Sequence, residues 1–118
     1  MKRLLLLCVA ALSLVAQSKS NLKITVEPKA EVKSDVEVPF QVVVKDAKGV
    51  PVSGAAVEVV ATMVEMDHGE FKYEGKPGKP GVYEFNPKFL MGGAWNLAVK
   101  VKKGADTATL SKKIDVKD

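Results

Sequence analysis

The chain has 118 residues, the length of a single domain, and a formal net charge of +4. Without Lys2 and Arg3, which precede an apolar leader, 16 basic residues stand against 14 acidic ones, and no arginine follows Arg3. The lysines are scattered, whereas nucleic-acid-binding domains typically show clustered basic residues with interleaved aromatics or a named motif. The composition therefore argues against a nucleic-acid-binding protein.

Residues 1–18 have the pattern of a secretory signal peptide. The apolar run 4–16 is too short to span a bilayer of about 30 Å as a helix, which takes roughly 20 residues. Ala16 and Ser18 fit the small-residue rule for cleavage after Ser18, with Ser20 as the second choice. We expect a mature domain 19–118 that is periplasmic or secreted and has no stable membrane span; an uncleaved anchor is the alternative.

The single cysteine, Cys8, lies inside the apolar run and not after it, so lipidation is not expected. The mature chain then has no disulfide, no thiolate metal site and no thiol nucleophile. A domain of about 100 residues without disulfides must be held together by its apolar core.

The pattern after the leader is almost wholly that of β-strands. Alternating apolar residues predict strands at 22–27, 36–46, 55–66, 82–85, 94–104 and 105–116. Pro39 inside the second of these suggests an edge strand or a bulge, because proline cannot donate to a ladder. The GKPGKPG segment, 75–81, predicts an exposed polar loop. Six or seven strands separated by turns predict an all-β, immunoglobulin-like antiparallel β-sandwich, with Trp95 as a core aromatic.

The stretch MVEMDHGEF, 63–71, carries two of the four methionines and the only histidine. If the strand before it runs unbroken, Met63 shares the face of Val57, while Met66 and His68 share the other face. Met63 then reads as core filler, and Met66 and His68 project together.

Thioether sulfur is a soft neutral ligand that suits Cu(I) or silver, and imidazole is also acceptable to copper. Met91, in the glycine-flanked turn FLMGG, is the candidate third ligand. The candidate metal set is thus Met66, His68 and Met91, with Met63 as a further member. Zinc is a poor candidate, since its usual ligands are lacking, and the acidic residues nearby lack the spacing of a calcium loop. The alternative is that no metal binds and that these four residues occur here through core packing or by chance on the surface.

The mature chain resembles the YtkA-like/FixH family of small exported β-sandwich domains. The resemblance extends from Val36 to Val101 and rests on DAKGVPVSGAAV, MVEMDHG, PGVYEF and FLMGGAWNLAV in that order. It implies copper handling, as in metal efflux or cytochrome oxidase assembly, and it carries over to Met63, Met66, His68 and Met91. FixH members look membrane-anchored, whereas the leader here looks cleavable, so the resemblance favours a soluble periplasmic protein.

Two functions therefore stay open. The first is an exported accessory protein that binds Cu(I) through methionine and histidine and works with an envelope efflux or oxidase-assembly protein. The second is a metal-free, immunoglobulin-like interaction module that docks through a sheet edge or the GKPGKPG loop. An enzyme is not expected, because no nucleophile–base constellation is present in the sequence.

Overall fold

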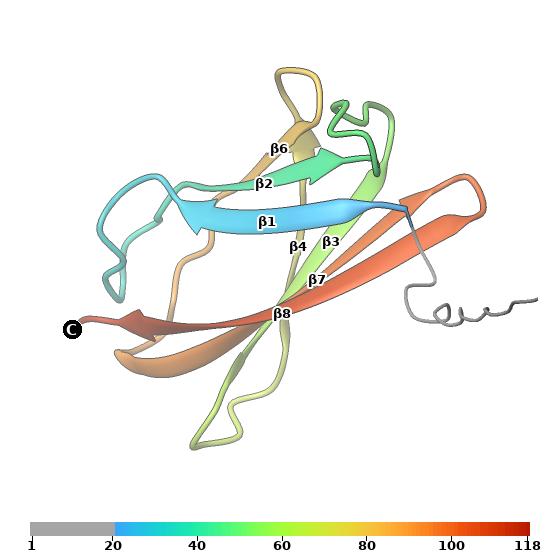
Figure 1. Ribbon diagram of the computed structural model, residues 1–118. Helices are drawn as coiled ribbons and strands as arrows, with labels where there is room; N and C mark the ends of the chain where they lie inside the picture. The colour runs from blue at the N-terminus through green and yellow to red at the C-terminus, as the bar shows by residue number, and fades with distance from the viewer. Residues whose placement is uncertain (1–20) are drawn as a thin grey trace, which may run out of the picture.

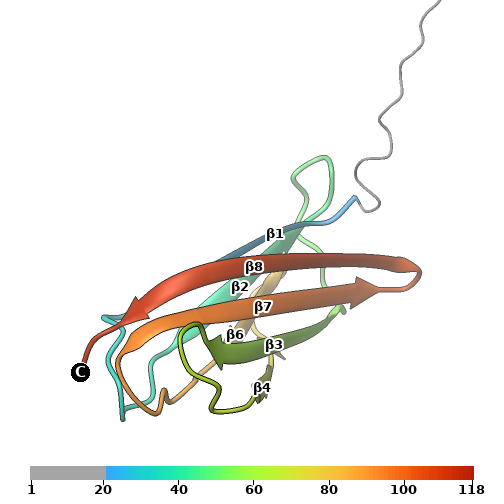
Figure 2. The same ribbon diagram turned by 90° about the horizontal axis from the view of Figure 1, so that it is seen from below.

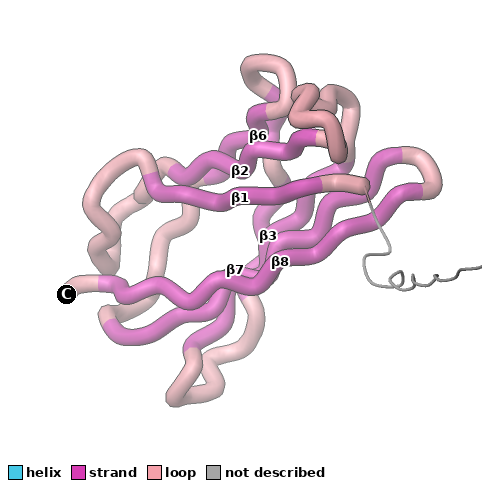
Figure 3. Tube along the Cα trace, in the orientation of Figure 1, coloured by secondary structure: helices cyan, strands magenta, loops and turns pink. Residues whose placement is uncertain are grey.

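The computed structural model describes residues 21–118, and this part of the chain is all-β (Figure 1, Figure 3). Its strands form two four-stranded sheets with the orders β1-β2-β6-β5 and β4-β3-β7-β8, and every pairing is antiparallel. The strands are β1 (Lys23–Pro28), β2 (Phe40–Lys45), β3 (Ala56–Met63), β4 (Phe71–Glu74), β5 (Lys76–Pro77), β6 (Val82–Phe85), β7 (Gly93–Lys103) and β8 (Asp106–Val116). The expected signal peptide, its cleavage site and Cys8 lie outside the described residues.

The two sheets pack face to face as an immunoglobulin-like β-sandwich, as the turned view in Figure 2 shows. The buried side chains come from both sheets and alternate along each strand, because successive residues of a strand point to opposite faces. In β2 the buried residues are Phe40, Val42 and Val44, and in β7 they start with Trp95 and Leu97. The predicted fold class and the core position of Trp95 are confirmed.

Aromatic rings fill the centre of this core. Phe40 stacks on Phe85 with ring centroids 5.3 Å apart, and Phe89 lies 5.2 Å from Trp95. The ring of Phe71, on β4, also lies close to Trp95, with centroids 6.0 Å apart. Aromatic contacts at these distances add to the burial energy of each ring.

The expected strand 36–46 was too long at its start. β2 begins only at Phe40, and Val36 is 49% exposed instead of sharing the buried face. Pro39 marks neither an edge nor a bulge, since β2 is an interior strand between β1 and β6. Proline is tolerated because it stands just before the ladder, where its carbonyl accepts the Lys29 N–H at 2.7 Å.

The sequence also missed two short strands, so the described sheets hold eight strands and not six or seven. β4 and β5 are separated by Gly75 and belong to different sheets. A Cβ at Gly75 would stand 2.9 Å from Val57, so the chain crosses between the sheets where a side chain would not fit. The GKPGKPG segment is largely exposed, as expected, but its Lys76–Pro77 pair forms β5 against β6.

Candidate functional site

Two loops meet at one end of the sandwich, which we call the loop end. The β3–β4 loop, 64–70, and the β6–β7 loop, 86–92, both reach it because β3 ends where β7 begins, with Met63 opposite Trp95. The Val64 N–H donates to the Ala94 carbonyl at 3.0 Å and so continues this pairing by one residue into the loop. The two loops lie near each other in Figure 2, whereas in Figure 1 the β3–β4 loop projects farther from the sheets than the β6–β7 loop.

Met63 is the last residue of β3 and is half-buried against the hydrophobic core. Its Cε lies 3.4 Å from the point where a Cβ of Gly93 would stand. The side chain thus fills the gap that this glycine leaves at the start of β7. Met63 has the environment of the core filler that strand alternation predicts for it.

Met66 and His68 are exposed, Met66 to 55%. The prediction of an unbroken strand that places both residues on one face is wrong, because β3 stops at Met63. The chain turns instead: Gly69 has φ +86°, and its N–H donates to Asp67 Oδ1 at 2.9 Å. The two residues are therefore carried on a turn beyond the sheet, where both are exposed.

Met91 lies on the facing loop and is 39% exposed. Its carbonyl accepts the indole N–H of Trp95 at 3.0 Å, and the next residue, Gly92, donates its N–H to Asp118 Oδ1 at 2.9 Å. Phe89, two residues earlier, is buried against Trp95. The backbone around Met91 is thus fixed by hydrogen bonds to Trp95 and Asp118, while its side chain is partly exposed.

The structure therefore brings Met66, His68 and Met91 to the same end on two neighbouring loops, while Met63 sits below them at the edge of the core. Acidic residues of the β3–β4 loop do not join into an oxygen site. Within residues 21–118 no group of three or more histidine, cysteine, aspartate or glutamate side chains is placed to hold an ion. The methionine–histidine ligand set remains a prediction.

The loop end is also apolar, which the sequence did not reveal. Four of the six large hydrophobic side chains that are exposed in the described structure lie on these two loops: Val64, Met66, Leu90 and Met91. Val64 was hidden in an apparent continuation of the strand, and Leu90 stands between buried Phe89 and exposed Met91 in a segment with no strand period. The sequence feature that could have indicated this apolar surface is the run FLM, 89–91, directly before two glycines.

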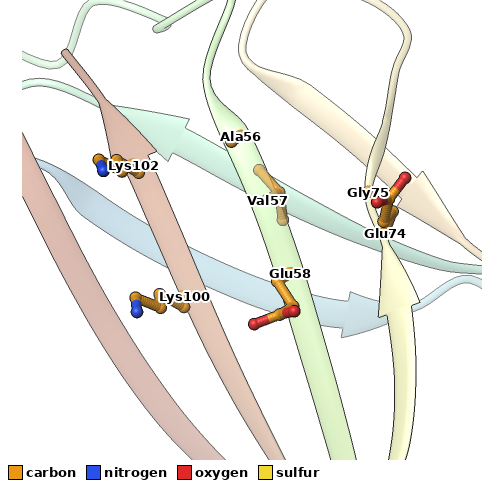
Figure 4. Close-up of a pocket in the computed structure, with 7 residues that line it drawn as sticks. All are labelled: Ala56, Val57, Glu58, Glu74, Gly75, Lys100 and Lys102. Carbon is orange, nitrogen blue, oxygen red and sulfur yellow. The ribbon is translucent and has the colours of Figure 1, made fainter.

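A separate hollow of about 400 Å³ lies on the outer face of the β4-β3-β7 sheet (Figure 4). Glu58 of β3 stands opposite Glu74 on one side and Lys100 on the other, with Lys102 further along β7. Like charges placed opposite each other on neighbouring strands repel, and the lysines offset this. The mixture of acidic and basic side chains is typical of the solvent-exposed face of a sheet, so we assign no binding site to this hollow.

No helix among residues 21–118 is long and apolar enough to cross a membrane.

No curated protein matches the chain. Among solved structures, the chain is similar to the CARDB domain of a Pyrococcus furiosus protein that was crystallised in complex with di-metal ions. The TM-score is 0.44 and the identity 16%, over 82% of this chain and 88% of that one. A family model described as YtkA-like matches residues 16–100. Since this match spans most of the chain, the protein belongs to the YtkA-like family.

Proposed function

We propose that this protein is an exported accessory module of the cell envelope that binds Cu(I), or silver, at its loop end. The observation that carries the proposal is the placement of Met66, His68 and Met91 on two adjoining loops, with both methionines exposed. Membership of the YtkA-like family supports it. Metal efflux and cytochrome oxidase assembly are the processes that such a module would serve, and a FixH-like role belongs to the same proposal.

The ligand chemistry suits an oxidising compartment. Thioether sulfur is neutral and needs no deprotonation, so methionine can bind Cu(I) where a cysteine would be oxidised. The β3–β4 loop can adapt around an ion because Met66 and His68 are exposed, whereas the carbonyl of Met91 is anchored by Trp95. Binding would therefore order the first loop against the second.

A metal-free interaction module is the second candidate, and the apolar character of the loop end favours it. Val64 and Leu90 add to the exposed surface without offering a metal ligand, and both are about half exposed. Exposed apolar groups that gather at one place are typical of a protein-docking surface. In both cases we propose a binding protein and not an enzyme.

Competition for Cu(I) between the protein and a chromophoric chelator, under reducing conditions, distinguishes the two candidates. We expect one ion per chain for the domain 19–118. A Met66→Ala/His68→Ala variant removes two of the three ligands, so its affinity should fall by more than the roughly 10–100-fold that loss of an outer hydrogen-bond partner costs a metal site.

Leu90→Ala is the matched control, because Leu90 is an exposed neighbour of Met91 that offers no ligand atom. It should leave the Cu(I) affinity unchanged. If the domain does not compete with the chelator, or if the double variant binds as well as the parent, the metal proposal fails and the interaction module takes its place.

A further inference from the structure

The end of the sandwich opposite the loop end gathers lysines, and we call it the lysine end. It is made by the start of β1, the end of β2 with the turn that follows, the β5–β6 turn and the β7–β8 turn (Figure 1). Five exposed lysines stand there against two acidic residues, Asp46 and Asp106. The lysines are Lys23, Lys45, Lys48, Lys79 and Lys103.

These lysines form one continuous surface. Lys45 bridges to Pro51 across the turn, and Pro51 packs against Gly81 at the end of the β5–β6 turn. The ammonium of Lys103 reaches Gly54, with Nζ 2.9 Å from the position of a Cβ there. A hollow of about 150 Å³ is lined by Gly54, Gly81 and Lys79, which connects the β5–β6 turn to the same surface.

The lysines of this surface form no ion pair within residues 21–118, although Asp106 stands opposite Lys103 in the β7–β8 register. Five ion pairs occur in residues 21–118, and none of them includes a lysine of the lysine end. Lys23 and Lys45 stand directly opposite each other on β1 and β2, an arrangement of like charges that costs stability. They border a hollow of about 220 Å³ with Thr25, Val43 and Gly49. The hollow itself is mainly apolar, so it is the two lysine charges at its border, which form no ion pair in residues 21–118, that are suited to an anionic surface.

The position of the leader points to what that anionic surface is. The apolar run 4–16 is separated from Lys23 by only six residues, which span at most roughly 20–25 Å when extended. While that run is in a membrane, the lysine end is therefore the part of the domain nearest to the lipid headgroups. Val50, at the tip of the turn beside Lys48, is 52% exposed and adds an apolar contact suited to a bilayer interface.

We propose that the lysine end docks the domain on an anionic phospholipid surface and that it does so after the leader is removed. Juxtamembrane lysines bind acidic headgroups by long-range attraction, which salt weakens. Docking in this way holds the loop end, with its methionines and histidine, at the far side of the domain and facing away from the lipid. The proposal concerns a different surface from the proposed metal site and stands independently of it.

Flotation of the copper-free domain 19–118 with lipid vesicles tests this. All core residues of the described structure lie between Val26 and Val116, so this chain keeps the whole core. We expect it to float with mixed phosphatidylglycerol and phosphatidylcholine vesicles at low salt. It should not float with phosphatidylcholine alone or with mixed vesicles at high salt. Each lysine at an anionic surface contributes roughly a fivefold gain in affinity, so Lys45→Gln/Lys48→Gln/Lys103→Gln should weaken binding roughly a hundredfold.

The control variant is Lys33→Gln/Lys88→Gln/Lys117→Gln, which removes the same charge from exposed lysines away from the lysine end. It should keep most of the binding. Equal losses in the two triple variants would show that net charge alone drives association and would overturn the proposal. Absence of binding to anionic vesicles at low salt would also overturn it and would direct attention to an acidic protein surface. Neither result bears on the Cu(I) titration.

Discussion

Single side chains tie the loops of this domain to its core. The phenol of Tyr83, a residue that is only 1% exposed, donates to the Val52 carbonyl at 2.7 Å and accepts the Ala55 N–H at 3.0 Å. It thereby holds the connection from β2 to β3, which passes from one sheet to the other. Trp95 plays a comparable part at the opposite end, since its indole N–H fixes the carbonyl of Met91.

Tyr83→Phe should lower the free energy of unfolding by about 1–3 kcal/mol, because it leaves a part-buried carbonyl and N–H without their partner while the ring stays in place. Urea unfolding followed by circular dichroism measures this. Tyr83→Leu should cost more, because it removes ring packing as well. A Tyr83→Phe variant as stable as the parent would show that water replaces the hydroxyl at no cost.

The β5–β6 turn approaches the β2–β3 connection closely at Gly81. Gly81 precedes β6 with φ +77°, and a Cβ there would stand 2.7 Å from Pro51 and 2.9 Å from the Val44 carbonyl oxygen. Its own carbonyl accepts the Val44 N–H at 2.8 Å. The β5–β6 turn and the β2–β3 turn can therefore meet only if this position has no side chain.

Gly81→Ala should lower the free energy of unfolding by about 2–4 kcal/mol, combining left-handed backbone strain with a steric clash. Gly104→Ala is the matched control, since Gly104 also has a positive φ of 60° but would place its Cβ in open space. It should cost about 1–2 kcal/mol. Thermal or urea unfolding of both variants measures the difference, and equal costs would contradict the close packing at Gly81.

Three titratable groups of the described domain have pKa values shifted from their ordinary ones. A hydrogen bond from Lys117, followed by the charge of Lys33, lowers the pKa of Glu31 below 4.5. The Val50 N–H, helped by the Lys48 N–H, lowers the pKa of Asp46 below 3.8. Burial raises the pKa of Tyr73 above 10.0, and a hydrogen bond with the Lys88 backbone opposes this in part.

The sign of the pH dependence follows from these directions. A carboxylate with a lowered pKa stabilises the folded state above its ordinary pKa, and this contribution is lost as the pH falls through the folded value. A phenol with a raised pKa favours the folded state below pH 10, and this is lost as the pH rises through the folded value. The melting temperature should therefore be highest between these limits and fall below about pH 4.5 and above about pH 10.

Asp46→Asn should make the acid-side fall shallower, because an amide oxygen can still accept the turn hydrogen bonds but does not titrate. Asp106→Asn is the control, since it removes a carboxylate from the same end of the domain without touching the hydrogen bonds that the Asp46 side chain accepts from Lys48 and Val50. Melting curves from pH 3 to pH 7 test this prediction. An unchanged slope in Asp46→Asn would show that this turn does not contribute to acid unfolding.

The sequence by itself determined the fold class and much of the core. Alternating apolar residues placed Val42, Val44, Leu97 and Trp95 on inward faces, because a strand with one buried face must repeat every two residues. It also identified the methionines and the histidine, since residue chemistry does not depend on the fold. The short strands β4 and β5 escaped it, because two to four residues on either side of a glycine carry too little period to be recognised.

Only the tertiary structure decided which residues meet. Whether Met66 and His68 lie on a strand or a turn depends on where β3 stops, and that is fixed by its pairing with β7 and not by local preference. The backbone of Met91 is held by the Trp95 indole, and the lysine end joins residues from four separate segments of the chain. Contacts between residues distant in sequence arise from sheet packing, which a pattern read along one chain does not specify.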